Sequence, residues 1–337
     1  MPRPRVFVTR NLPGNALDLL RDACSVTVWP GEMPPSPDDL RREAASAHGL
    51  VTLLTDRVDD ALLAAAPQLV AVSNMATGFD NIDVAAASQH LVLVARTPGV
   101  LTETSADLAF GLLLAAARRI AEGDRYVRAG KWRTWGPETM LGPDVHGATL
   151  GIVGLGRIGT AVARRAAGFG MRTLYHSRER KQDAERELGA EYASLDELLR
   201  ESDFVSLHSA LTNETRGLIG ARELGLMKPT AILVNTARGP LVDQAALYEA
   251  LRSGTIAGAA LDVTDPEPLP ADSPLLTLEN IVITPHIASA SVATRSEMAR
   301  LAAENLLACV RGEVNENVVN AEIADEWRDT YARRVSV

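Results

Sequence analysis

The sequence contains few cysteines, few aromatic residues and no excess of positive charge. Only Cys24 and Cys309 occur among the 337 residues, which excludes a disulfide framework or a cysteine-built metal cluster. Aromatic residues make up 4% of the chain, so the core must consist mostly of Ala, Val, Leu and Ile. The 34 Lys and Arg residues face 43 Asp and Glu residues, a formal net charge of −9. This balance argues against general binding to nucleic acid or to an anionic membrane.

Long hydrophobic runs are missing too. The most apolar stretch, Leu108–Ala117, is far shorter than the roughly 20 residues that cross a bilayer. The N-terminus has no apolar run of the kind that signal peptides carry. We therefore expect a soluble, cytoplasmic protein. Its apolar content of 46% is that of a globular chain, and its length predicts about two domains.

Short apolar segments alternate with helical patterns in two blocks. Strands are predicted from Arg5–Thr9 to Leu91–Ala95 in the first block, and six more from Leu150–Val153 to Ile281–Thr284 in the second. Parallel strands need helical crossovers, so this alternation predicts an α/β fold with two doubly wound parallel sheets. Two long helices, Glu103–Gly123 and Ser289–Gly312, are expected to join the blocks. The tail after the last helix shows no clear pattern.

Histidines without a partner pattern are expected at the surface. These are His48, His90 and His146. No two histidines have the spacing of metal ligands, so we predict no metal site.

A glycine-rich turn opens the second block. Gly154, Gly156 and Gly159 form a GxGxxG pattern with Leu155, Arg157 and Ile158, directly after an apolar strand and before a helical segment. Such glycines allow a tight turn and a close approach of the backbone to a pyrophosphate at the helix N-terminus. This context predicts a dinucleotide site; the alternative is a tight turn without a ligand.

The end of the next strand bears on the choice of dinucleotide. NAD-dependent enzymes place an acidic residue about 20 residues after the glycines, where it binds the ribose 2′-hydroxyl. Here that place is held by His176 or Ser177, followed by Arg178 and Arg180. A hydroxyl and guanidinium groups suit a 2′-phosphate, so NADP(H) is the predicted preference. NAD(H) stays possible because Glu179 could turn inward.

Three further residues follow strands of the second block. Arg238, Glu267 and His286 come just after the predicted strands Ile232–Asn235, Ala257–Leu261 and Ile281–Thr284. Ligands of doubly wound sheets bind at this edge. Reduction of a 2-keto acid by hydride leaves an alkoxide, which a protonated His can protonate while a carboxylate holds its ring and an Arg grips the substrate carboxylate. The alternative, purely structural roles are an ion-pair donor for Arg238, a rigid turn residue for Glu267 and a strand-end cap for His286.

The chain resembles the D-isomer-specific 2-hydroxyacid dehydrogenases, and within them the glyoxylate/hydroxypyruvate reductases. The matching segments cover nearly the whole chain: MATGFDNID at Met75–Asp83, RTPGVLTETSADLAFGLLL at Arg96–Leu114, GIVGLGRIG at Gly151–Gly159, VNTARGPLVD at Val234–Asp243, ALDVTDPEPL at Ala260–Leu269 and ITPHIAS at Ile283–Ser289. The resemblance implies an NAD(P)-dependent enzyme with Arg238, Glu267 and His286 as its catalytic residues.

The family's organisation implies the remaining assignments. A Rossmann nucleotide domain, 99–287, is inserted into a flavodoxin-like substrate domain of 1–98 and 288–337. Backbone groups of Ala76, Thr77 and Gly78 would bind the substrate carboxylate, together with Arg238 and His286. The cofactor contacts implied, besides the glycine-rich turn with its Leu155, Arg157 and Ile158, are Thr102, Ser177, Arg178, Arg180, His208, Thr236, Ala237, Arg238, Asp262, His286 and Ala288.

Relatives are dimers, so a homodimer is expected. Trp132 and Trp135 lie in a loop that reaches the partner subunit in this family, where they would pack in the interface or line the neighbour's pocket.

Rival functions stay open at this point. One is a dehydrogenase for another small anion, such as formate, phosphite or a different 2-hydroxy acid. Glu267 disfavours formate, for which relatives carry Gln, and Thr77 disfavours phosphite, for which they carry Lys. The other is a non-enzymatic, nucleotide-sensing corepressor scaffold. The leading prediction is an NADP(H)-preferring reductase that converts glyoxylate or hydroxypyruvate to glycolate or D-glycerate.

Overall fold

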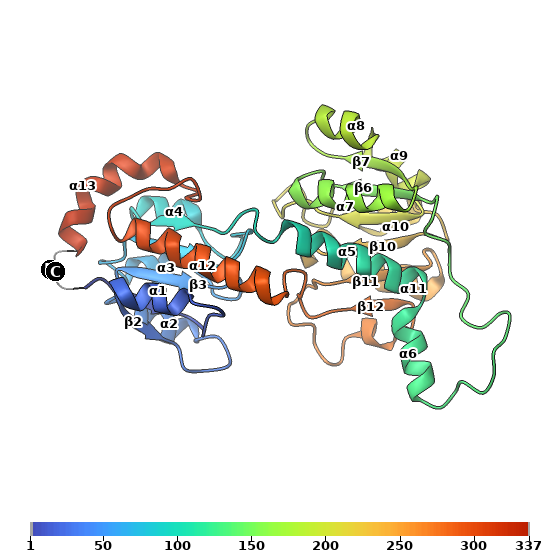
Figure 1. Ribbon diagram of the computed structural model, residues 1–337, viewed down its shortest axis with the longest axis horizontal. Coiled ribbons are helices and arrows are strands. Elements are labelled where there is room, and N and C mark those ends of the chain that lie inside the picture. Colours follow the sequence, from blue (N-terminus) through green and yellow to red (C-terminus); the bar gives the residue numbers. More distant parts are fainter. Residues whose placement is uncertain (1–2, 336–337) are drawn as a thin grey trace. The chain divides into compact units, whose positions relative to one another are not determined.

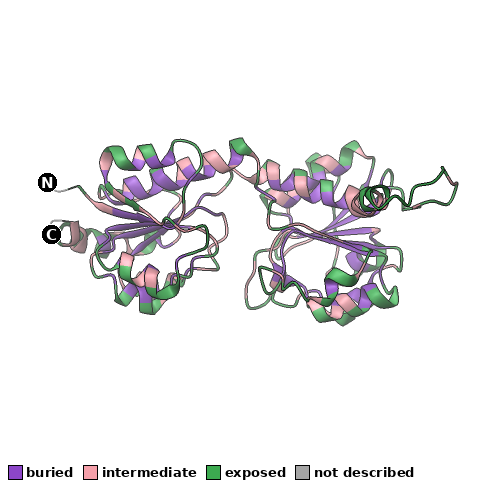
Figure 2. Ribbon diagram, turned by 90° about the horizontal axis from the view of Figure 1, so that it is seen from below, coloured by how far each residue is buried: buried purple, intermediate pink, exposed green. Residues whose placement is uncertain are grey.

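The computed structural model describes residues 3–335 and divides into two compact units (Figure 1). One unit consists of Met1–Leu101 and Ala290–Val337, and the other of Thr102–Ser289. Each unit has a fully parallel sheet covered by helices on both faces. In each, the inner strands of the sheet are buried (Figure 2). Parallel sheets are covered in this way because each crossover places a helix on a face.

The first unit contains a five-stranded sheet in the order β2-β1-β3-β4-β5, the flavodoxin-like arrangement. Helices α1 and α12 pack on one face of the sheet, and α2, α3 and α4 on the other. The elements are β1 (Arg5–Val8), α1 (Ala16–Ala23), β2 (Ser25–Val28), α2 (Pro37–Ala44), β3 (Gly49–Thr52), α3 (Asp60–Ala64), β4 (Ala71–Asn74), α4 (Val84–Gln89), β5 (Leu93–Ala95), α12 (Val292–Cys309), η3 (Ala321–Ile323) and α13 (Ala324–Val335).

The second unit contains a seven-stranded sheet in the order β12-β11-β10-β9-β6-β7-β8, which is a Rossmann order with one added edge strand. Helices α5, α7 and α8 contribute to the core on one face, and α9, α10 and α11 on the other. The elements are α5 (Thr102–Ala117), α6 (Ile120–Arg128), β6 (Thr149–Val153), α7 (Arg157–Gly168), β7 (Arg172–His176), α8 (Gln182–Leu188), β8 (Glu191–Tyr192), α9 (Leu195–Glu201), β9 (Phe204–Leu207), α10 (Ala221–Leu226), β10 (Ile232–Asn235), η1 (Gly239–Leu241), α11 (Gln244–Ser253), β11 (Gly258–Leu261), η2 (Pro274–Thr277) and β12 (Ile281–Ile283).

The predicted fold class is confirmed, but three of its elements differ. The single helix expected over Glu103–Gly123 is two helices, because Arg119 adopts a left-handed conformation with φ of 52° that ends α5 and starts α6. The second sheet has seven strands instead of six, since the two-residue β8 is too short to show an apolar pattern. The tail without a pattern forms helix α13.

One histidine also differs from its prediction. His48 was expected at the surface, yet only 2% of it is exposed. Its Nδ1 accepts a hydrogen bond of 2.8 Å from the Arg5 backbone N–H, so it fills a polar position at the start of the first sheet. Burial, aided by the charge of Arg5, lowers the pKa of His48 and keeps the ring neutral. No helix in residues 3–335 is long and apolar enough to cross a membrane.

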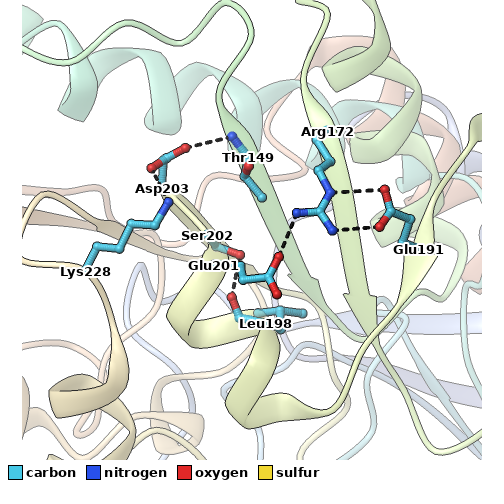
Figure 3. A network of polar contacts seen from close by, with 8 residues as sticks. All are labelled: Thr149, Arg172, Glu191, Leu198, Glu201, Ser202, Asp203 and Lys228. Carbon is cyan, nitrogen blue, oxygen red and sulfur yellow. Dashed lines mark hydrogen bonds and ion pairs between the residues drawn. The ribbon is translucent and has the colours of Figure 1, made fainter.

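Ion pairs tie together the amino ends of four strands of the second unit (Figure 3). Arg172, which begins β7, bonds to Glu191 of β8 and to Glu201 at the end of α9, with its closest contacts at 2.7 Å. Asp203, just before β9, accepts bonds from the first N–H of β6 and from Lys228. These pairs hold the edge of the sheet opposite to the carboxyl ends of the strands, where ligands of this fold bind.

A buried tryptophan helps to anchor helix α13. Trp327 is fully buried in the core of the first unit, and its Nε1 donates a hydrogen bond of 2.9 Å to the carbonyl of Val70. We expect Trp327→Ala to lower the free energy of unfolding by about 3–5 kcal/mol, because it leaves a cavity in the core and removes this hydrogen bond. Urea denaturation followed by circular dichroism measures this change. Met33→Ala, at a side chain that is 74% exposed, should shift it by less than about 0.5 kcal/mol. Equal unfolding midpoints for the two variants would contradict the anchoring role.

Candidate active site

Three neighbouring strands of the second sheet bring the predicted acid–base residues to one edge. Arg238 follows β10, Glu267 lies in the loop after β11, and His286 follows β12. These strands are adjacent in the order β12-β11-β10 and run in the same direction, so their carboxyl ends share an edge. The loops that leave this edge are therefore neighbours.

The carboxylate of Glu267 contacts the ring of His286 directly. His286 Nδ1 lies 2.6 Å from Glu267 Oε1, and the other carboxylate oxygen accepts a longer bond of 3.4 Å from the Thr264 N–H. Burial opposes the ionisation of Glu267, but the hydrogen bond and charge of His286, with a smaller contribution from Arg238, outweigh it and lower its pKa. The carboxylate is thus ionised at neutral pH and can accept a hydrogen bond from the ring of His286.

Asp262 holds the backbone that carries His286. It is buried, and its Oδ1 accepts bonds from the Thr284 hydroxyl (2.6 Å) and the Ile287 N–H (2.8 Å), while Oδ2 accepts from the Ala288 N–H (2.8 Å). His286 itself has a left-handed backbone with φ of 54°, a conformation that is costly for a residue with a side chain. The three bonds to Asp262 hold the loop in this conformation and so fix the direction of the ring.

The loop of Arg238 is shaped by an asparagine and a glycine. The side chain of Asn235 donates to the Arg238 carbonyl (2.8 Å) and accepts from the Ala237 N–H (3.0 Å), which turns the chain at the end of β10. A Cβ on Gly239 would lie 1.9 Å from the carbonyl oxygen of Thr264, so only glycine fits there. This close approach joins the loop of Arg238 to the loop that carries Glu267.

The glycine-rich turn fits a bound pyrophosphate. Gly154 has φ of 98°, and a Cβ there would come within 2.7 Å of the Ser209 backbone nitrogen. A Cβ on Gly159 would lie 2.3 Å from the Gly154 carbonyl, whereas the space around Gly156 is open. Helix α7 starts directly after Gly156, which provides no side-chain cap for its first N–H groups. The open position and the uncapped helix end leave room and hydrogen-bond donors for phosphate oxygens.

Two of the other predicted cofactor contacts carry buried hydroxyls without a partner. The hydroxyls of Ser177 and Thr236 are buried and find no hydrogen-bond partner within the described chain, as expected of groups that await a ligand. Arg178 is exposed, and Thr102 is the first residue of α5.

Several of the remaining contacts are already engaged within the unit. The N–H groups of Ala237 and Ala288 bond to Asn235 and Asp262, as described above, and Arg180 pairs with Glu185. His208 Nε2 lies 2.8 Å from the Ser206 hydroxyl, and burial lowers the pKa of His208 to about 4, so it is neutral.

In the first unit, the loop after β4 presents free N–H groups. Its carbonyls are all occupied: that of Ala76 accepts from the Thr97 N–H (2.9 Å), that of Thr77 from Arg96 (3.4 Å) and that of Gly78 from Asn74 (3.1 Å). The N–H groups of Thr77 and Gly78 have no partner among residues 3–335. A loop fixed by its carbonyls with successive N–H groups unpaired is suited to bind an anion.

The sequence interpretation missed the residues that position this chemistry. Asn235, Gly239 and Thr264 were not singled out, and Asp262 was assigned to the cofactor rather than to the loop of His286. A short polar side chain at a strand end, as in Asn235, is a known signal for a local turn. The approach of Gly239 to Thr264 joins residues distant in the sequence and leaves no such signal.

The chain is similar to known proteins in sequence and in fold. Residues 110–288 match the family model described as D-isomer specific 2-hydroxyacid dehydrogenase, NAD binding domain. The chain is 56% identical over 322 residues to a glyoxylate reductase of Korarchaeum cryptofilum, covering 95% of this chain and 97% of the relative.

Two solved structures extend the comparison. A protein from Thermus thermophilus shares a TM-score of 0.88 and 50% identity over 94% of this chain and 99% of that one. An NADPH-dependent glyoxylate/hydroxypyruvate reductase from Sinorhizobium meliloti, solved with NADP and malonate, shares a TM-score of 0.82 and 33% identity over 94% of this chain and 97% of that one.

The chain belongs to the D-isomer-specific 2-hydroxyacid dehydrogenase family. It is an oxidoreductase of the NAD(P)-dependent type, and the expected resemblance to glyoxylate reductases is confirmed.

The Glu267–His286 contact predicts that turnover depends on the carboxylate of Glu267. Glu267→Gln should lower kcat for 2-oxo acid reduction by about ten-fold or more, because the carboxylate that orients the ring of His286 is lost. Steady-state rates at saturating substrate and cofactor measure this change. The control is Glu249→Gln on α11, which should keep the wild-type kcat; an unchanged kcat in Glu267→Gln would contradict the pairing.

Proposed function

We propose that the protein reduces glyoxylate and hydroxypyruvate to the corresponding D-2-hydroxy acids, glycolate and D-glycerate, and prefers NADPH. The observation that carries this proposal is the 2.6 Å contact between His286 and Glu267 beside Arg238, at the strand ends of an NAD-binding domain. The names of the relatives, glyoxylate reductase and glyoxylate/hydroxypyruvate reductase, support the choice of substrates.

Each member of the trio has a distinct task in this proposal. When bound, the reduced dinucleotide supplies the hydride for the substrate carbonyl carbon. Arg238 holds the substrate carboxylate and polarises the adjacent carbonyl. His286 donates the proton that the developing alkoxide oxygen needs, and Glu267 keeps the ring oriented. Asp262 acts as a positioning residue, because its carboxylate holds the loop of His286.

The loop after β4 in the first unit is a proposed binding site for the substrate carboxylate. We propose that residues 1–98 and 288–337 act as the substrate domain and 99–287 as the nucleotide domain. The unpaired N–H groups of Thr77 and Gly78 suit a small carboxylate, which glyoxylate and hydroxypyruvate share.

The preference for NADPH rests on the end of β7. No acidic residue occupies the position just after the strand, where a ribose 2′-hydroxyl would need one. Ser177 offers a buried hydroxyl without a partner, and Arg178 an exposed guanidinium. A hydroxyl and a guanidinium are suitable donors to a phosphate dianion.

A panel of 2-oxo acids assayed with NADPH and NADH tests substrate and cofactor together. We expect the highest kcat/KM for glyoxylate and hydroxypyruvate, with NADPH favoured over NADH by about ten-fold or more, as two charge-assisted hydrogen bonds would give. A higher kcat/KM with NADH would refute the cofactor preference. Failure to turn over any 2-oxo acid while binding the cofactor would favour a nucleotide-sensing role instead.

We further propose a homodimer built through α6 and the loop that follows it. No residue of α6 is buried, and Figure 2 shows this helix and loop largely exposed. The large apolar side chains left in solvent here include Ile120 (58% exposed), Trp132 (62%) and Trp135 (79%). Such a concentration on one segment is typical of a surface covered by a partner, and a second copy of this chain is the partner we propose.

Sedimentation velocity tests the homodimer. The wild-type chain should sediment with about twice the monomer mass, and the double variant Trp132→Ser, Trp135→Ser should shift toward the monomer. Met33→Ser, at an exposed apolar residue of the first unit, is the matched control and should stay dimeric. A monomeric wild-type protein would overturn the proposal.

A further inference from the structure

The loop between β7 and α8 is held at both of its ends. At its start, His176 Nδ1 lies 3.1 Å from the carbonyl oxygen of Ala193. At its end, the hydroxyl of Tyr175 accepts a 2.7 Å bond from the Lys181 N–H and donates a 2.6 Å bond to Glu185 Oε1. Tyr175 is fully buried, so these bonds start from a fixed point in the core. The two arginines of this loop, Arg178 and Arg180, are therefore presented by a fixed backbone.

Arg180 is committed to a partner inside the protein. Its Nε and Nη2 bond to the two oxygens of Glu185 at 2.9 and 3.0 Å, the parallel arrangement that pairs a guanidinium with a carboxylate most strongly. The guanidinium also lies 5.8 Å from the ring centre of Tyr192, a cation–π distance. Hydrogen bonds from Arg180 and Tyr175 lower the pKa of Glu185, so the carboxylate stays charged and neutralises Arg180.

Arg178 differs from Arg180 in each of these respects. It is exposed and sits next to Ser177, whose buried hydroxyl has no partner among the described residues. Its charge makes a small contribution to the lowered pKa of Glu214 in the loop after β9. Within residues 3–335, Arg178 forms no ion pair. Arg178 thus retains its hydrogen-bonding capacity and its charge for an incoming anion.

We propose that Tyr175 and Glu185 withhold Arg180 from the cofactor, so that Arg178 is the one guanidinium of this loop that binds the 2′-phosphate. Glu185 is a positioning residue in this scheme, because it acts through Arg180 without touching the cofactor. The inference rests on the proposed preference for NADPH and changes the sequence-based assignment, which gave both arginines to the phosphate.

The dissociation constants of NADPH and NADH, measured by cofactor fluorescence, distinguish the roles of Arg178 and Arg180. Arg178→Gln should raise the Kd of NADPH by about ten-fold or more and leave that of NADH within about two-fold, because only NADPH carries the phosphate. The matched variant Arg180→Gln should change both constants by less than about three-fold. If Arg180→Gln weakens NADPH as much as Arg178→Gln does, the inference is wrong.

A second experiment tests whether Glu185 keeps Arg180 away from the 2′-phosphate. Added to Arg178→Gln, Glu185→Gln should lower the Kd of NADPH by about three-fold or more, because it releases Arg180 toward the phosphate. The triple variant that also carries Arg180→Gln should lose this recovery, which a purely structural role of Glu185 would not predict. No recovery in the double variant overturns the inference. If the wild-type protein binds NADH more tightly than NADPH, the proposed cofactor preference is wrong. The Kd values of the variants for NADPH still distinguish the roles of the two arginines in that case.

Discussion

The contact between Glu267 and the Nδ1 edge of His286 is the constraint on which the rest of the active site depends. It sets which ring nitrogen faces the carboxylate, so the opposite edge of the ring is the one that can give a proton to a substrate. Both residues lie in loops, and loops alone rarely hold two side chains at 2.6 Å. The surrounding structure has to supply the rigidity.

That rigidity comes from the sheet edge and from buried polar groups beside it. Both carboxylate oxygens of Asp262, which follows β11, accept hydrogen bonds from the backbone after β12. These bonds fix the direction of the His286 ring. Gly239 lets the loop after β10 touch the loop after β11, and Asn235 turns the chain so that Arg238 emerges there. The same logic recurs after β7, where Tyr175 fixes the loop that carries Arg178. In each case a residue at or near a strand end positions a functional side chain on the neighbouring loop.

Much of this could be predicted from the sequence because it depends on local patterns. Buried parallel strands are nearly continuous apolar runs, and the GxGxxG turn, like Arg238, Glu267 and His286, follows such runs directly. Several of the misses depend on contacts between distant segments. Trp327 of α13 bonds to Val70, and the buried His48 bonds to the backbone of Arg5. The break at Arg119 is a local change of φ that an apolar pattern does not reveal.

The most direct test of the account is the rate of a single turnover in the variant His286→Asn, with NADPH bound before glyoxylate is added in a stopped-flow instrument. If His286 donates the proton, oxidation of the bound NADPH should slow by about a hundred-fold or more, while the Kd of NADPH changes by less than about two-fold. A single-turnover rate close to that of the wild-type protein would contradict the central claim.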